Sequence, residues 1–188
     1  NELKQTNAFQ LHLTDKKQLS GLPQTAIEAA AQAAKEKELE GWLITLHFPS
    51  YQPFMTYADD RELRRQLYMA KMTICAHGDE FDNRQIVQRI VNLRQEIAQL
   101  LGYDTYADYV LTRRMAQDSK HVNQLIDQLL NAYMPVAKAE LRELELKARQ
   151  IEGPDFTLMP WDWAYYSHKL KLERYNLDAE MLRPYFPL

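Results

Sequence analysis

The sequence predicts a mainly α-helical protein, an irregular bundle of about six helices with a small two-stranded β element near the N-terminus. Three observations favour this fold class. Apolar residues recur every three or four positions over most of the chain. Each of the 5 glycines falls between such stretches, as expected because glycine weakens a helix. Period-two alternation, which is typical of strands, is confined to two short segments.

The first alternating segment lies near the N-terminus, where Phe9, Leu11 and Leu13 are separated by polar residues. The second covers residues 42–48 and includes β-branched side chains. We therefore expect a short two-stranded element within about residues 9–48. Two strands alone are only marginally stable, so we expect this element to pack against helices.

Helical periodicity predicts the other elements. The alanine-rich stretch between the two strands is expected to carry Pro23 in its first turn. Pro49 and Pro53 predict a turn around residues 50–51. The predicted helices cover residues 24–39, 60–76, 83–101, 105–115, 120–151 and 160–175. The candidate N-terminal caps are Asp59 or Asp60, Asp82 or Asn83, and Asp104 or Thr105.

The longest predicted helix covers residues 120–151 and opens at Ser119. At 1.5 Å per residue it would measure about 48 Å, whereas a compact domain of this size is roughly 40 Å across. Either Pro135 kinks this helix, or the protein is elongated because a packing partner is missing. We find no linker, and we expect residues 1–188 to form a single helical segment of a larger protein.

Composition excludes several classes of function. Hydrophobic residues make up 46% of the chain, which is enough for a buried core, and the net charge of −3 offers no basic face for nucleic acid. No apolar run reaches the roughly 18–20 residues that span a bilayer. The first residues lack a signal-peptide pattern, but the chain begins with Asn1 and is interpreted as a piece of a longer protein.

A search for catalytic residues gives no candidate. The 5 histidines, at positions 12, 47, 77, 121 and 168, include no pair with the one-turn spacing of a helical zinc site. The segment from His77 to Glu80 is interpreted as a solvated turn around Gly78. Cys75 is the only cysteine, and we expect it to be a small buried hydrophobe within a helix. No catalytic and no metal-binding residue is therefore predicted.

Aromatic side chains are unusually dense at two places. Trp161, Trp163, Tyr165 and Tyr166 lie within six residues of one another, and a second group contains Tyr51, Phe54 and Tyr57. Packing between two layers is the favoured explanation for both groups. The alternative is a wall of a peptide-binding channel, or an interface with a missing domain. Under that alternative the exposed surface would comprise Trp161, Trp163, Tyr165, Tyr166, Tyr51 and Tyr57.

The order of several short sequences along the chain resembles the thimet oligopeptidase family of metallopeptidases. These sequences are Gly41-Trp42, Pro49-Ser50-Tyr51-Gln52-Pro53, Arg61-Glu62-Leu63-Arg64, Leu100-Leu101-Gly102-Tyr103, Ala107-Asp108-Tyr109, Pro160-Trp161-Asp162-Trp163 and Pro184-Tyr185-Phe186. Together they cover nearly the whole chain. These short sequences are most similar to those of the peptidyl-dipeptidase branch, also called dipeptidyl carboxypeptidase, with oligopeptidase A as the near alternative.

The resemblance implies a largely helical zinc peptidase with a deep channel that admits short peptides. It implies a His-Glu-x-x-His motif plus a downstream Glu as zinc ligands, with the Glu of the motif as general base. Nothing in this chain matches that motif. We expect zinc in the parent enzyme and none bound by this segment, which would be inactive alone.

The expected partners are the missing catalytic C-terminal half and short peptides that lose dipeptides from the C-terminus, with no nucleic acid and no membrane. Self-association of the segment through exposed apolar residues is also expected. The expected compartment is the cytoplasm, with the periplasm or export as the alternative. The competing hypothesis is a stand-alone helical interaction module without enzymatic activity.

Overall fold

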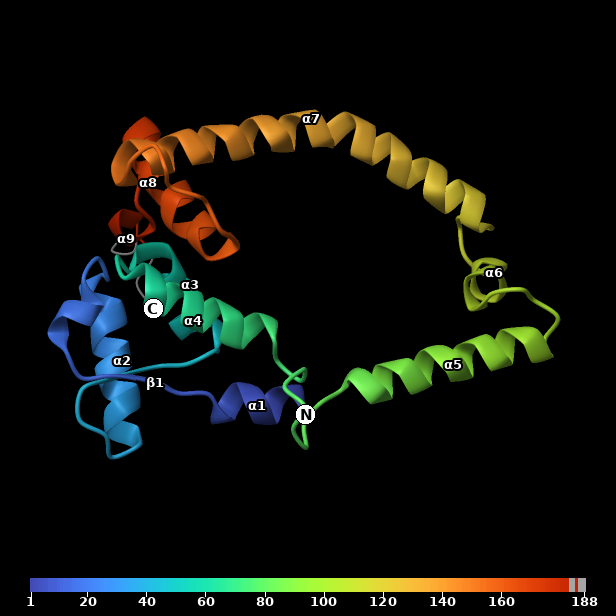
Figure 1. The fold of residues 1–188 in the computed structure, drawn as a ribbon, viewed down its shortest axis with the longest axis horizontal. Helices are drawn as coiled ribbons and strands as arrows, with labels where there is room; N and C mark the ends of the chain where they lie inside the picture. The colour runs from blue at the N-terminus through green and yellow to red at the C-terminus, as the bar shows by residue number, and fades with distance from the viewer. Residues whose placement is uncertain (183–184, 186–188) are drawn as a thin grey trace. The chain divides into compact units, whose positions relative to one another are not determined.

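The computed structural model describes residues 1–182 and 185, so Pro184 and Phe186 of the family-like sequences lie outside the described residues. Contacts divide the chain into two units. Unit 1 comprises Asn1–Phe81 with Glu143–Leu188, and unit 2 comprises Asp82–Arg142. The mainly helical fold with one small sheet near the N-terminus is confirmed (Figure 1).

The elements of unit 1 come from both ends of the chain. Its N-terminal part contains α1 (Glu2–Ala8), β1 (Leu11–Leu13), η1 (Lys16–Leu19), α2 (Gln24–Glu36), β2 (Trp42–Ile44), α3 (Phe48–Tyr57) and α4 (Arg61–Met72). Its C-terminal part contains η2 (Pro160–Asp162), α8 (Trp163–Tyr175) and α9 (Ala179–Leu182). Unit 2 contains α5 (Arg84–Leu100), α6 (Tyr106–Leu111) and the first part of α7 (Ser119–Glu152), which continues into unit 1.

The two strands pair antiparallel, with Leu11 opposite Ile44. Both are shorter than the alternation predicts. The second strand ends at Ile44 because the backbone N–H of Thr45 donates to Ser50 Oγ at 2.9 Å instead of to a neighbouring strand. Gly41, just before β2, has φ +96°, and a Cβ there would lie 2.3 Å from the carbonyl oxygen of Leu13. Only glycine allows this close approach.

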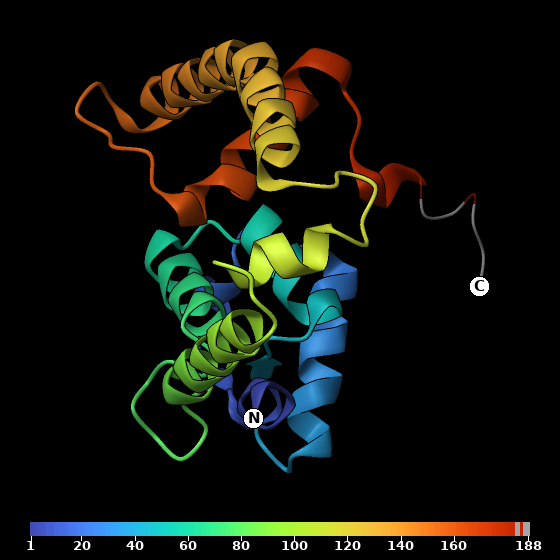
Figure 2. The same cartoon turned by 90° about the vertical axis from the view of Figure 1, so that its right-hand side faces the viewer.

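The predicted turn at Pro49 and Pro53 is wrong, since this segment forms α3. Pro49 lies in the first turn, where its missing N–H would have no partner within the helix anyway. Pro53 removes one interior hydrogen bond, but burial of Phe54 and Met55 in the core offsets that loss. α3 contacts both α2 and α8, as the two views show (Figure 1, Figure 2).

Several helix ends differ from the predicted ones. α4 ends at Met72 rather than 76, and Cys75 lies in the following turn with φ +60°, so it is buried but not helical. α2 ends at Glu36 rather than 39, since Glu38 adopts φ +58°. α6 ends at Leu111 rather than 115. The shorter ranges reflect left-handed or turn residues that periodicity alone does not reveal.

The caps are partly as predicted. Asp60 accepts the Leu63 N–H at 3.0 Å and so caps α4, and Thr105 accepts from the Asp108 N–H at 3.1 Å at the start of α6. At α7, however, Asp118 rather than Ser119 accepts the His121 N–H, at 2.8 Å. α7 remains a continuous helix through Pro135.

Unit 1 holds the buried core. Its first cluster joins the sheet with α2, α3 and α4, and contains Leu13, Leu19, Leu22, Ala30, Ile44, Leu46, Phe54, Met55, Ala58, Leu63 and Leu67. A second cluster joins the end of α7 with α8, and contains Leu144, Ala148, Tyr165 and Tyr166. These two clusters fix the position of α8 beside α3 and α4.

Unit 2 has very little core of its own. Ala98 is the one buried residue that the structure records between Asp82 and Arg142. The apolar stripe predicted on residues 83–101 is present on α5, but its members Ile86, Ile90, Leu93, Ile97 and Leu100 are 43–87% exposed. In the part of the chain that the structure describes, no helix is both long and apolar enough to cross a bilayer.

Candidate functional site

The aromatic residues of 160–166 occupy very different environments. Tyr165 and Tyr166 are 7% and 1% exposed, whereas Trp163 is 48% exposed. Trp161 is partly buried, with its ring centroid 6.1 Å from that of Tyr68 in an edge-on arrangement. One helix therefore supplies both core residues and one accessible indole.

Tyr165 and Tyr166 lie in the interior of this chain and belong to the second core cluster. The Tyr165 hydroxyl donates to Asp59 Oδ1 at 2.8 Å, and the Tyr166 hydroxyl donates to Glu152 Oε1 at 2.9 Å. Burial raises the pKa of both tyrosines, and the hydrogen bonds to carboxylates raise it further. Both phenols therefore stay neutral donors that tie α8 to its neighbours.

The second aromatic group is also divided. Tyr51 is partly buried against the first cluster, and Phe54 is fully buried. Tyr57 lies where α3 meets α8: its hydroxyl donates to Asp178 Oδ1 at 2.7 Å, and its ring stands edge-on to His168 with centroids 4.6 Å apart. The structure thus brings Tyr57 and Trp163 to one place, where both side chains line the same pocket.

That place is a pocket of about 510 Å³ between α3 and α8, which we call the α3–α8 pocket. Its lining includes Gln52, Thr56 and Tyr57 of α3 and Trp163, His168 and Lys171 of α8. Its volume falls in the range of roughly 300–1,000 Å³ that is usual for ligand sites. The mixture of an aromatic face, an ammonium and amide or hydroxyl groups could hold a small polar–apolar molecule.

His168 lines the pocket together with two other titratable side chains, Lys171 and Glu180. Burial lowers its pKa, and the positive charges of Lys169 and Lys171 act in the same direction. Asp178, whose Oδ2 lies 3.9 Å from His168 Nε2, opposes this shift without reversing it. The imidazole is therefore mainly neutral at pH 7, and it serves as a wall residue rather than as an anion-binding cation.

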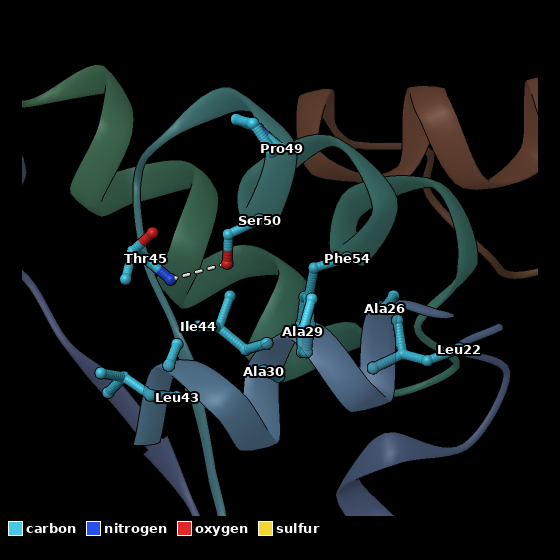
Figure 3. A pocket seen from close by; sticks show the side chains of 11 residues that line it. Leu22, Ala26, Ala29, Ala30, Leu43, Ile44, Thr45, Pro49, Ser50 and Phe54 are labelled. Carbon is cyan, nitrogen blue, oxygen red and sulfur yellow. Dashed lines mark hydrogen bonds between the residues drawn. The ribbon is translucent and has the colours of Figure 1, made fainter. Parts of the chain in front are cut away.

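A smaller pocket of about 130 Å³ lies where α2, β2 and α3 meet (Figure 3). Its lining is almost wholly apolar and includes Ala26, Ala29 and Ala30 of α2 facing Ile44 and Phe54 (Figure 3). The small alanine side chains leave the space open. It could accept one apolar side chain, but it is too small and too apolar to bind a peptide backbone.

A buried ionic cluster, which periodicity did not reveal, joins α4 to η2. Asp162 is fully buried and accepts from Arg61 Nη2 at 2.7 Å and from Arg64 Nη2 at 3.0 Å. The Met159 N–H also donates to Asp162, at 3.0 Å. Arg64, itself 1% exposed, donates to the carbonyl oxygen of Ala58 at 2.7 Å and lies over the Tyr165 ring.

This cluster is structural, since every oxygen of Asp162 faces a donor within the fold. A signal for it was present in the sequence. A carboxylate between two tryptophans in a buried helix start must find a cation, because an unpaired buried charge is very costly. Arg61 and Arg64, three residues apart and so on one face of a helix, could have been recognised as that cation pair.

Among the described residues, no group of three or more His, Cys, Asp and Glu side chains is arranged to hold a metal ion. His77 contacts Thr73, and Asp79 accepts from Gln5 Nε2 at 2.6 Å. That no metal binds to this segment stays a prediction.

Known proteins resemble the chain over its full length. The model of peptidase family M3 matches residues 54–188, which is more than half of the chain. Oligopeptidase A of Escherichia coli (strain K12) is 40% identical over 191 residues, covering 100% of this chain and 28% of that protein. Dipeptidyl carboxypeptidase of the same strain is 34% identical over 179 residues, covering 95% and 26%.

Saccharolysin of Saccharomyces cerevisiae is 33% identical over 180 residues, covering 92% of this chain and 25% of that protein. The chain thus spans about a quarter of the length of the curated relatives that it matches. The resemblance to this family of metallopeptidases is thereby confirmed. The chain belongs to peptidase family M3.

Proposed function

We propose that this chain is a non-catalytic helical portion of a zinc-dependent oligopeptidase. The observation that carries the proposal is the alignment of the whole chain to about a quarter of proteins named as oligopeptidases. The sequence contains no His-Glu-x-x-His motif, so the zinc ligands and the general base would come from the remaining three quarters of such a protein. The cytoplasm is the proposed compartment.

The substrates in this proposal are short peptides cut internally. The sequences of single motifs favoured the peptidyl-dipeptidase branch. Sequence identity over the aligned residues is higher to oligopeptidase A than to dipeptidyl carboxypeptidase, at 40% against 34%. Dipeptide release from the C-terminus is the second candidate, because the dipeptidyl carboxypeptidase still aligns with 95% of the chain.

We further propose that the surface formed by Trp163 and Tyr57 faces either the peptide or the catalytic part of the enzyme. Trp163 is about half exposed, whereas Tyr165 and Tyr166 on the same helix are buried. Exposed aromatic side chains of this kind are typical of binding surfaces. α8 is fixed by two core clusters, so the surface would be rigid.

The test uses a full-length polypeptide of the relatives' length that carries this chain. We expect one zinc per polypeptide and cleavage of a peptide whose C-terminus is amidated, since internal cleavage needs no free carboxylate. Cleavage only of the free acid, two residues from its end, would favour dipeptide release. A full-length protein without zinc or cleavage would instead support the stand-alone interaction module.

The 188-residue chain is the control, and we expect it to be inactive. In the full-length protein, Trp163→Ala should raise KM more than it lowers kcat, whereas Trp42→Phe, within the sheet, should leave both unchanged. Unchanged kinetics and unchanged melting for Trp163→Ala would contradict the surface proposal.

A further inference from the structure

We propose that the apolar faces of α5 and of the first part of α7, both in unit 2, bind apolar helix faces from the part of the enzyme outside these 188 residues. The inference rests on the proposed function, since it takes this chain to be part of a longer peptidase. It assigns the contact with the rest of that enzyme to a surface separate from the two aromatic groups. We call the two faces the α5 stripe and the α7 stripe.

The α5 stripe is one open side of an amphipathic helix. Its members follow one another by four, three, four and three residues, which places them on one face of the helix. They are 43–87% exposed and comprise Ile86, Ile90, Leu93, Ile97 and Leu100. The stripe is about 21 Å long at 1.5 Å per residue. Contiguous apolar surface of this kind marks an interaction site.

The α7 stripe continues an interface that already exists in unit 1. Near the C-terminal end of α7, Leu144 and Ala148 are 3% and 0% exposed, because α8 packs against them. Helical spacing places four apolar residues of unit 2 on the same side of α7 as Leu144. These are 46–66% exposed and comprise Ile126, Leu129, Tyr133 and Val136. The face that a helix covers in unit 1 therefore extends uncovered into unit 2.

The small core of unit 2 argues for a partner that is always present. Ala98 is the one buried residue that the structure records between Asp82 and Arg142, so burial within unit 2 offsets little of the chain entropy lost on folding. A second copy would stabilise unit 2 only at concentrations above the dissociation constant. A segment of the same polypeptide acts at a high effective concentration. Oligopeptidase A of Escherichia coli aligns with this chain over 28% of its length, which leaves most of such a protein to supply that segment.

The spacing of both stripes favours helices as the partner. Side chains three and four residues apart form ridges that fit between the ridges of another helix. The α8 helix already covers α7 in this way in unit 1. An added strand would instead need the free backbone groups of a sheet edge, which a helix face does not offer.

The test is cysteine labelling in a full-length polypeptide that carries this chain. Ile90→Cys and Leu129→Cys place a thiol in the α5 stripe and the α7 stripe. The matched controls Gln88→Cys and Asn131→Cys place one on the opposite side of the same helices, where the native side chains are exposed. Each variant is treated with iodoacetamide under native conditions. Mass spectrometry of the digested protein then gives the rate of modification at each position, separately from any other cysteine.

We expect the two stripe variants to react at least about tenfold more slowly in the full-length polypeptide than in the 188-residue chain, because reaction there requires local opening. The 188-residue chain is kept dilute enough to be monomeric in sedimentation. The two control variants should react equally fast in both polypeptides. Hydrogen exchange of the unaltered polypeptides makes the same comparison without a substitution, and the α5 amides should exchange more slowly in the full-length one.

Equal rates for the stripe variants in the two polypeptides, together with equal exchange of the α5 amides, would overturn the proposal. Protection that increases with protein concentration would assign the stripes to a second copy and would also overturn it. Equal protection of the control variants would overturn the assignment to the stripes. Labelling needs no cleavage, so protected stripes in an inactive full-length protein would refute only the proposed function. Unprotected stripes in an active peptidase would refute only this inference.

Discussion

Replacing Asp162 tests whether the buried ionic cluster holds unit 1 together. The carboxylate is fully buried, and it neutralises Arg64, which is 1% exposed. Arg61 is 41% exposed, so water can partly replace the carboxylate there. In Asp162→Ala the guanidinium of Arg64 would stay buried next to the Tyr165 ring with only the Ala58 and Asp59 carbonyl oxygens as partners.

The expected cost follows from that uncompensated charge. Removing one partner of a buried ion pair typically destabilises a protein by about 3–5 kcal/mol. Asp162→Asn keeps the shape and one acceptor oxygen but loses the charge, so we expect a smaller loss of about 1.5–3 kcal/mol. Asp162→Leu combined with Arg64→Met should recover much of the loss, because an apolar pair of similar size leaves no charge unpaired.

The assay is urea unfolding followed by tryptophan fluorescence. All 3 tryptophans lie in unit 1, so the signal is confined to the unit that the substitution affects. Glu62→Ala, which breaks the exposed pair with Arg65 on the same helix, is the matched control and should change stability very little. A loss below about 1 kcal/mol for Asp162→Ala, or a double variant no more stable than the single one, would refute the reasoning.

Three further predictions concern other parts of the molecule. The pKa of His168 is lowered in the folded state, so the unfolded chain takes up a proton first as the pH falls through about 6.5. This contribution to the free energy of unfolding should be fully present above that pH and lost below it. Urea unfolding should show a smaller decrease of stability below that pH in His168→Gln than in the unaltered chain. Phe54→Ala should cost about 3–5 kcal/mol in the same assay, since Phe54 is 0% exposed, and a cost under about 1 kcal/mol would contradict its core position. The chain should self-associate in sedimentation equilibrium through the exposed stripe of α5, and Ile90→Glu but not Gln88→Glu should weaken this association.

Hydrophobic periodicity predicted the helices that carry a regular apolar stripe, and it failed where contacts between distant parts of the chain decide the structure. The range of α5 was predicted to within a residue at each end, because its apolar spacing is regular and Gly102 follows it. α3 was missed since its two prolines favour a turn locally. Burial of Phe54 and Met55 between α2, α4 and α8 overrides that preference, and local sequence does not contain this information.

The candidate site was predictable in composition but not in arrangement. The two aromatic groups were both identified, yet burial separates their members. Tyr166 is a core residue while Trp163, three positions earlier, is half exposed. Lys171 gave no signal, because an isolated lysine on a helix is ordinarily a solvated side chain. Its place in the pocket depends on packing between α3 and α8, which belong to opposite ends of the chain.

The polar side-chain contacts that join the two parts of unit 1 connect residues far apart in the sequence. Arg64 and Asp162 are 98 residues apart, and Asp59 and Tyr165 are 106 apart. Closing a loop of about 100 residues costs about 4 kcal/mol of chain entropy by the logarithmic relation. Unit 2 buries few side chains, so burial within it offsets little of that entropy cost.

Apolar packing alone could supply this free energy, but apolar contacts tolerate a shift of one helix along another. A carboxylate that must meet two guanidinium groups allows one alignment of η2 on α4. That alignment also sets the position of α8, which follows directly at Trp163. The ionic cluster therefore acts with the two core clusters to position the indole of the α3–α8 pocket, and a substitution at Asp162 that left the fold intact should still displace the Trp163 resonance.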